Sequence, residues 1–138
     1  MDTKDLHKVF VYGSLKRGGN IRGSQMFKSA INVGQAQTTA GIYSMYDLGA
    51  FPGVTLDGKH DINGEVLLID DETLKQFDMI EGYPDFYDKT DVETTEGRAI
   101  MYYLPNERVT DNEGNPGYYK NEESDQITAT SKMLTWNL

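Results

Sequence analysis

A single glutamate occupies a position where a predicted helix would bury a carboxyl group at the helix end. Residues 72–81 are predicted to be helical, with Leu74, Phe77 and Ile80 on the face turned toward the core. At 100° per residue, position 81 returns to within about 20° of Leu74, so Glu81 shares that apolar face. Burial and the negative end of the helix dipole both raise the pKa of a carboxyl group, which suits Glu81 for proton transfer near pH 7. The alternative is that the helix ends one turn earlier and that Glu81 points into water.

A second candidate is the turn Tyr12-Gly13-Ser14-Leu15, which follows an apolar run at residues 8–12. Glycine allows a sharp change of direction, and consecutive backbone N–H groups in such a turn can bind an anion or a polarised carbonyl. The alternative is a plain junction between strand and loop, in which Ser14 makes a local hydrogen bond. The glycine spacing does not match a phosphate-binding P-loop, because no Gly-Lys-Ser/Thr follows.

Three aromatic residues, Tyr83, Phe86 and Tyr87, follow Glu81 closely, and Pro84 constrains the turn between them. They could form the wall of a pocket. They could equally be ordinary aromatic residues of the core.

The elements that must position these residues are short strands and few helices. Strands are expected at 8–12 and within 33–46, the latter broken near Gly41, and a loop with one aromatic, Phe51, at 47–53. A hairpin around Asp57-Gly58 is predicted from 54–56 and 61–69, and another around Glu96-Gly97 from 90–95 and 98–104. Residues 21–29 could form a short helix. The helix at 72–81 is expected to begin at Asp70 or Asp71 and to stop at Gly82.

This order of elements predicts an α+β fold, a small mixed β-sheet curled into a barrel with flanking helices. The length of 138 residues and the absence of internal repeats favour one domain over 1–138, with 105–138 a less well defined C-terminal extension.

The composition argues against several classes of function. There is no cysteine, and neither His7 nor His60 has metal-ligand spacing, so no metal site and no cofactor are expected. The formal net charge of −9 disfavours nucleic-acid binding. No apolar run is long enough to span a membrane, and the first residues do not resemble a secretory signal, so a cytoplasmic protein without a membrane role is expected.

Taken together, four segments resemble the gamma-glutamylcyclotransferase-like family, which includes gamma-glutamylamine cyclotransferases and AIG2-like proteins. They are VFVYGSLKRGG at 9–19, GIYSMYDLGAFPGV at 41–54, INGEVLLID at 62–70 and LKQFDMIEGYPDFYDK at 74–89. The pair YGSL and EGYPxxY, some 65 residues apart, is the most specific part of the resemblance. The chain departs from the family at Lys89, where arginine is frequent.

The resemblance implies a mixed β-barrel and an intramolecular acyl transfer, and a substrate of the gamma-glutamylamine type is expected. In that reaction the α-amine of a γ-glutamyl compound attacks the γ-carbonyl, which releases 5-oxoproline and an amine or amino acid. By position, Glu81 would be the general acid/base, Tyr12, Gly13, Ser14 and Leu15 would bind the substrate, and Tyr87 would line the pocket. A non-catalytic small-molecule binding module on the same fold is the alternative. The group on the γ-carbonyl and the oligomeric state stay open.

Overall fold

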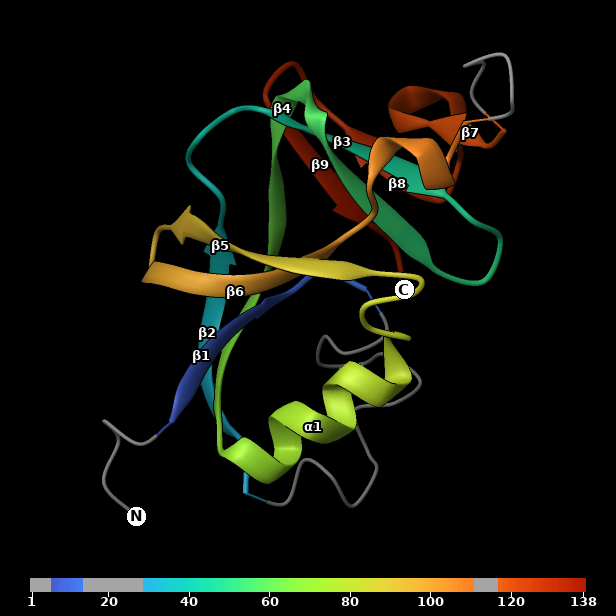
Figure 1. The fold of residues 1–138 in the computed structure, drawn as a ribbon. Coiled ribbons are helices and arrows are strands. Elements are labelled where there is room, and N and C mark those ends of the chain that lie inside the picture. Colours follow the sequence, from blue (N-terminus) through green and yellow to red (C-terminus); the bar gives the residue numbers. More distant parts are fainter. Residues whose placement is uncertain (1–5, 14–28, 111–116) are drawn as a thin grey trace.

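The computed structural model describes residues 6–13, 29–110 and 117–138, which form nine strands, one α-helix and two short 3₁₀ helices (Figure 1). In chain order the elements are β1 (His7–Val11), β2 (Ile31–Gln37), β3 (Tyr43–Asp47), β4 (Pro52–Ile69), α1 (Asp71–Ile80), β5 (Asp88–Thr94), β6 (Gly97–Tyr103), η3 (Asn106–Arg108), β7 (Tyr119–Lys120), η4 (Asn121–Glu123), β8 (Ile127–Ala129) and β9 (Met133–Trp136). The expected helix at 21–29 lies almost entirely outside the described residues.

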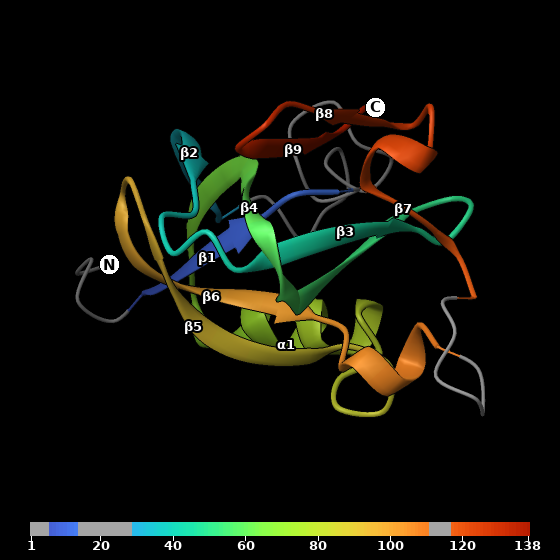
Figure 2. The same ribbon diagram turned by 90° about the horizontal axis from the view of Figure 1, so that it is seen from above.

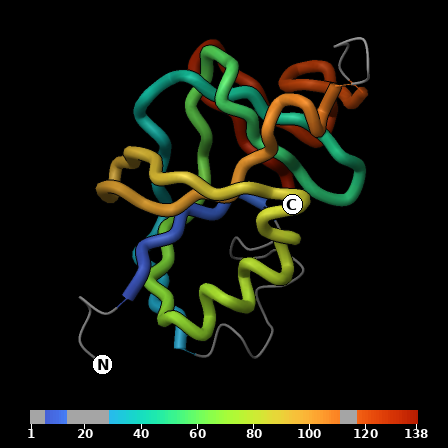
Figure 3. The backbone as a smooth tube through the Cα atoms, viewed as in Figure 1, coloured from blue at the N-terminus to red at the C-terminus, as the bar shows by residue number. Residues whose placement is uncertain are grey.

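The long strand β4 organises the sheet, because its two halves have different partners. Its first half pairs with β3, and its second half pairs with β1 and β2, all antiparallel. Strand β1 runs parallel to β6 on its other side, so it lies between β4 and β6 (Figure 3). The predicted hairpin of β5 and β6 is confirmed, with Thr94 opposite Gly97 at the turn.

The predicted hairpin at Asp57-Gly58 is wrong, since the chain continues through these residues as part of β4. The register with β3 shifts there, from Thr55 opposite Ser44 to His60 opposite Tyr43, which marks a bulge. The amide of Gly58 donates to the carbonyl of Ile42 at 2.8 Å. A Cβ at Gly58 would lie 2.1 Å from the Tyr43 oxygen, so the glycine permits close contact with β3 and does not form a turn.

Helix α1 covers the face of the sheet that carries Val9 of β1 and Leu67 and Ile69 of β4 (Figure 1). Phe77 is fully buried against these residues, as the helical periodicity predicts. The Asp70 carboxylate caps the helix by accepting from the Thr73 amide at 2.8 Å. This packing fixes the C-terminal end of α1 relative to the end of β1.

The α+β class is borne out, but the closed barrel is not confirmed. The pairing path in the described sheet runs from β5 through β6, β1, β4 and β3 to β7, and it does not return as a ladder to its first strand. One isolated bridge between Thr38 and Thr94 brings β5 near the end of β2. The described residues also hold a single α-helix, where flanking helices were expected.

The chain after residue 105 adds strands to the same sheet. Strand β7 pairs with β3, and β9 pairs in parallel with β4 and antiparallel with β8 (Figure 2). Within the part of the chain that the structure describes, no helix is long and apolar enough to cross a membrane.

Candidate active site

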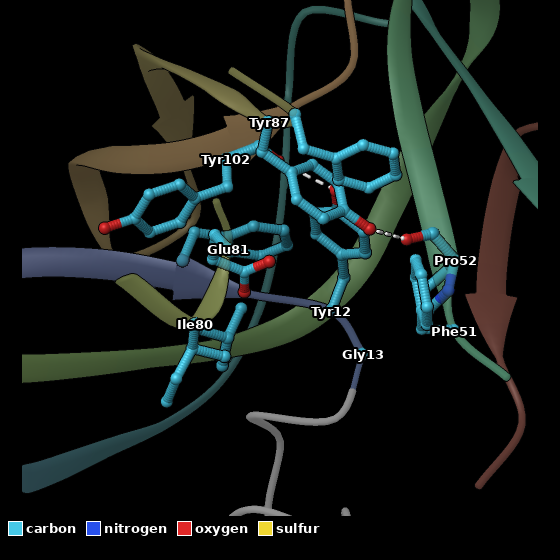
Figure 4. A pocket seen from close by; sticks show the side chains of 11 residues that line it. Tyr12, Gly13, Phe51, Pro52, Ile80, Glu81, Tyr87 and Tyr102 are labelled. Atoms are coloured by element: carbon cyan, nitrogen blue, oxygen red, sulfur yellow. Dashed lines mark hydrogen bonds between the residues drawn. The ribbon is translucent and has the colours of Figure 1, made fainter. Parts of the chain in front are cut away.

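A cavity of about 160 Å³ opens where the C-terminal end of α1 meets the ends of β1 and β6 (Figure 4). Its lining combines buried strand residues, aromatic side chains and one carboxyl group. The lining residues are Phe10, Val11, Tyr12, Gly13, Phe51, Pro52, Ile80, Glu81, Phe86, Tyr87 and Tyr102. The cavity therefore brings together Tyr12, Gly13, Glu81 and Tyr87, the residues of the predicted catalytic and substrate-binding set that the structure describes.

Glu81 is held in this cavity by the way α1 ends. It is the C-cap residue, and Gly82 follows with a positive φ of 63°. The Gly82 amide donates to Met79 at 3.2 Å, and the Tyr83 amide donates to Asp78 at 2.9 Å, which together form a Schellman motif. The left-handed conformation favours glycine, so the stop at Gly82 determines where Glu81 lies.

The Glu81 carboxyl group is half-buried among apolar and aromatic side chains. This burial raises the pKa of Glu81 to about 7, because the charged form loses hydration. At neutral pH the group is thus divided between its acid and base forms. A carboxyl in this state can both accept and return a proton.

Tyr12 lines the cavity with its ring, while its hydroxyl group is occupied in the core. The hydroxyl donates to the Tyr102 carbonyl at 2.7 Å and accepts from the Val54 amide at 3.3 Å. Burial and the nearby Glu81 raise the pKa of Tyr12 above its usual value, so the phenol stays neutral. Tyr12 consequently links β1 to β4 and β6 and positions the residue that follows it.

Gly13 and Pro52 both line the cavity and lie close to each other (Figure 4). A Cβ on Gly13 would come within 2.9 Å of the Cδ and Cγ atoms of Pro52. The φ of Gly13 is not positive, so the close approach of Pro52 explains the glycine at this position. Ser14 and Leu15 lie outside the described residues, and their roles stay predictions.

Tyr87 is buried, and its hydroxyl group donates to the Pro52 carbonyl at 2.5 Å. Burial, followed by the nearby Tyr12 and Glu81, raises the pKa of Tyr87. The Tyr87 side chain therefore presents its ring to the cavity and fixes Pro52 opposite Gly13.

The other two aromatic candidates differ in position. Phe86 lines the cavity and makes edge-to-face contacts with Phe51 and Tyr87, at centroid distances of 6.1 and 4.9 Å. The Tyr83 ring is not in the lining and instead lies under the Lys89 ammonium, 4.4 Å from Nζ to its centroid. Arg108 donates to the Phe86 carbonyl at 2.5 Å and holds the segment that carries Phe86.

Sequence reasoning did not identify Tyr102 and Pro52 as parts of the site. Both come from strands, and only the pairing of β1 with β4 and β6 brings them to the cavity. The alternation of residues 98–104 could have shown that Tyr102 shares a face with Ile100 and Leu104. It could not have shown which face meets α1.

Within residues 6–13, 29–110 and 117–138, no group of three or more histidine, aspartate or glutamate side chains is arranged to hold a metal ion. The described lining of the cavity offers one carboxyl group, backbone groups and aromatic side chains.

Comparison with known sequences finds relatives that are named as gamma-glutamylcyclotransferases. Over 100 residues the chain is 39% identical to a Vibrio cholerae protein named "Putative gamma-glutamylcyclotransferase", a match that covers 70% of this chain and 80% of the relative. A Methanocaldococcus jannaschii protein of the same description is 35% identical over 103 residues, a match that covers 70% of this chain and 83% of the relative.

Solved structures show the same fold. A mouse AIG2-like protein superposes with a TM-score of 0.62 at 23% identity and covers 85% of this chain and 97% of its own. The protein ytfP of Escherichia coli superposes with a TM-score of 0.55 at 31% identity, and the match covers 71% of this chain and 82% of ytfP. Residues 9–126, which include the whole described cavity, match the family model described as gamma-glutamyl cyclotransferase, AIG2-like. The chain belongs to this gamma-glutamyl cyclotransferase, AIG2-like family.

Proposed function

We propose that this protein is a γ-glutamyl cyclotransferase that releases 5-oxoproline and a free amine or amino acid, with Glu81 as its general acid/base. The observation that carries the proposal is the half-buried Glu81 carboxyl, whose pKa burial raises to about 7, in the same cavity as Gly13 at the end of β1. A proton shuttle and a backbone turn are the two parts that this cyclisation needs.

The first step forms the ring. Glu81 in its carboxylate form accepts a proton from the substrate's α-amine, and the nitrogen attacks the γ-carbonyl carbon of the same molecule. A tetrahedral centre with a negatively charged oxygen results. Backbone N–H groups of the turn that begins at Tyr12 and Gly13, and continues through Ser14 and Leu15, would donate to this oxygen.

The second step releases the leaving group. The bond between the γ-carbon and its original nitrogen breaks, and Glu81 returns the proton to that nitrogen. One C–N bond forms and one breaks, no water is consumed, and Glu81 ends as the carboxylate that began the cycle. One carboxyl group with a pKa near 7 suits both transfers, because neither protonation state is strongly disfavoured.

The described lining favours a substrate of the γ-glutamylamine type. The more exposed part of the cavity is formed by Phe51, Ile80 and Phe86, and the described lining residues include no lysine or arginine. A leaving amine without a carboxylate fits this described surface better than an amino acid does, because none of the described lining residues is a cation that could pair with the carboxylate.

The test is a substrate panel that contains γ-glutamyl amines, the γ-glutamyl derivative of the lysine ε-amine, γ-glutamyl amino acids and glutathione. We expect 5-oxoproline to form, and to form fastest from the amines. Binding of these compounds by calorimetry without any 5-oxoproline would instead identify a non-catalytic binding module and would contradict the proposal.

A further inference from the structure

Next to the cavity, Asp78, Lys89 and Tyr102 form a compact polar cluster on three different elements. The Lys89 ammonium contacts both carboxylate oxygens of Asp78, at 2.9 and 3.0 Å. The Tyr102 hydroxyl group donates to one of these oxygens at 2.5 Å. The carboxylate of α1 thus binds one residue of β5 and one of β6 at the same time.

Tyr102 connects this cluster to the two parts of the candidate active site. Its ring lines the cavity that contains Glu81, and its hydroxyl group binds Asp78, one helical turn before Glu81. Its carbonyl oxygen accepts from the Tyr12 hydroxyl at 2.7 Å. Tyr102 therefore makes one hydrogen bond to the last turn of α1 and one to the residue that follows β1.

The ion pair in this cluster is well shielded. The side chains of Lys89 and Asp78 expose only 22% and 24% of their surface, and the Tyr83 ring covers Lys89. Such a pair is stiffer than a solvent-exposed one and keeps its partners in one geometry. The pair also neutralises the carboxylate that lies nearest to Glu81 along the helix.

We propose that Asp78, Lys89 and Tyr102 form a positioning network that holds the Glu81 carboxyl group against the strand end at Tyr12 and Gly13. The inference rests on the proposed function, since it assigns these residues a part in the work of Glu81. It also assigns a role to Lys89, whose ammonium pairs with Asp78.

The network sets the electrostatic surroundings of Glu81. Among the described residues, the charge of Glu81 acts on the phenols of Tyr12 just after β1, Tyr87 before β5 and Tyr102 on β6. Burial raises the pKa of all three phenols, so they remain neutral around pH 7. The Asp78–Lys89 pair adds two opposite charges on α1 and β5, one helical turn from Glu81, and in the intact protein these two charges offset each other.

Removing one partner of the pair exposes the charge of the other. Lys89→Met leaves the Asp78 carboxylate uncompensated, which disfavours a second negative charge and raises the pKa of Glu81. Asp78→Asn leaves the Lys89 ammonium uncompensated, which favours a negative charge nearby and lowers the pKa of Glu81. Each shift is expected to be a few tenths of a pH unit, because the groups are separated by one helical turn.

The experiment compares Lys89→Met, Lys89→Arg, Asp78→Asn and Tyr102→Phe with two controls on the exposed part of α1, Lys75→Met and Glu72→Gln. Two quantities are measured for each variant. The first is kcat and KM with the best substrate of the panel. The second is the titration of the Glu81 side-chain carboxyl by ¹³C NMR, with the signal assigned by its loss in Glu81→Gln.

We expect Lys89→Met and Asp78→Asn to lower kcat about tenfold with KM changed less than twofold, because misplacement of a proton shuttle acts on the chemical step. Lys89→Arg should restore kcat to within about threefold, since arginine can make the same bidentate pair. Tyr102→Phe keeps the ring and should lower kcat without a change of charge. Both control variants should match the parent.

Opposite shifts of the Glu81 titration in Lys89→Met and Asp78→Asn would support the network. Shifts in the same direction, or kcat values equal to those of the controls, would overturn it. The NMR titration requires no turnover, so it tests the network even if the parent forms no 5-oxoproline, a result that would contradict only the proposed function.

Discussion

The main-chain carbonyl of Glu81 accepts a hydrogen bond from the Tyr87 amide at 3.3 Å, so one short turn holds both the candidate acid/base and a wall of its pocket. Within this turn the Phe86 amide donates to the Gly82 carbonyl at 2.7 Å. The segment that follows α1 is thus closed on itself by backbone hydrogen bonds. Replacing a side chain in the turn should leave its backbone in place.

The first prediction concerns Glu81→Gln, which keeps the shape of the side chain and removes its titratable proton. If Glu81 shuttles protons, kcat should fall by about 10²–10⁴, the usual contribution of general acid/base catalysis, while KM changes little. The measurement is the rate of 5-oxoproline release from the best substrate of the panel.

Glu72→Gln is the matched control, because Glu72 lies exposed in the first turn of the same helix. It should retain the parent's kcat. A Glu81→Gln variant with kcat within threefold of the parent would falsify the assignment. Glu65, on β4 opposite Val11, would then be the next carboxylate to replace.

A second prediction is the pH dependence of kcat/KM. Glu81 must be ionised to accept the proton of the attacking amine, and burial raises its pKa to about 7. The rate should therefore increase with pH and reach half of its plateau near pH 7. Initial rates between pH 5 and 9 check this, and a half-maximum near pH 4.5, typical of an exposed glutamate, would contradict it.

A third prediction concerns stability. Between pH 4.5 and about 7 the folded state holds the Glu81 proton while the unfolded state releases it, so the free energy of unfolding falls as the pH rises. Above pH 7 Glu81 is ionised in both the folded and the unfolded state, and the loss of stability no longer changes with pH. The loss should be on the order of 2 kcal/mol for this half-buried group. The Glu81→Gln variant should not show this pH-dependent loss of stability.

Urea unfolding of the parent and of Glu81→Gln at pH 4.5, 6 and 8 measures this difference. Because all other groups are shared, the variant should gain stability relative to the parent as the pH rises. A stability difference that is independent of pH would show that Glu81 titrates alike in both states.

Local sequence signals were sufficient to predict the helix that ends at Glu81. The apolar spacing of α1, the Asp70 cap and the stop at Gly82 are contacts between near neighbours, so their positions followed from residue types alone. The hairpin of β5 and β6 was predictable for the same reason.

Non-local pairing decided what the sequence could not predict. Asp57-Gly58 favours a turn locally, but β3 pairs with β4 on both sides of it and keeps the strand continuous. Likewise, Tyr102 reaches the cavity only because β6 pairs in parallel with β1, which places Met101 opposite Phe10. A pattern of neighbouring residues cannot predict which residues of β1 and β6 pair with each other.

The fourth prediction concerns Tyr12→Phe, which removes a hydroxyl group that has two partners in the core. The variant leaves the Val54 amide and the Tyr102 carbonyl without this hydrogen bond, and stability should fall by about 1–2 kcal/mol. KM should change little, because the hydroxyl group is already occupied. A large rise in KM without loss of stability, measured by kinetics and urea unfolding, would instead make the phenol a substrate ligand.

The last prediction concerns Gly13→Ala. The added methyl group would meet Pro52 at 2.9 Å, and the Pro52 carbonyl is held by a hydrogen bond from the Tyr87 hydroxyl group. Since Pro52 cannot easily move, the end of β1 must shift, and the substrate turn shifts with it. We expect KM to rise about tenfold, with a smaller effect on kcat, because substrate placement is disturbed while Glu81 is not.

Gly117→Ala provides the control for Gly13→Ala, because its methyl group would lie at an ordinary 3.6 Å from the Val109 oxygen. That variant should keep the parent's KM. If Gly13→Ala kept both the KM and the kcat of the parent, the contact between Gly13 and Pro52 would not be part of the substrate site, and the proposed role of the turn after β1 would have to be abandoned. If kcat fell and KM did not, the turn would act on the transition state alone, as a donor to the developing oxyanion does.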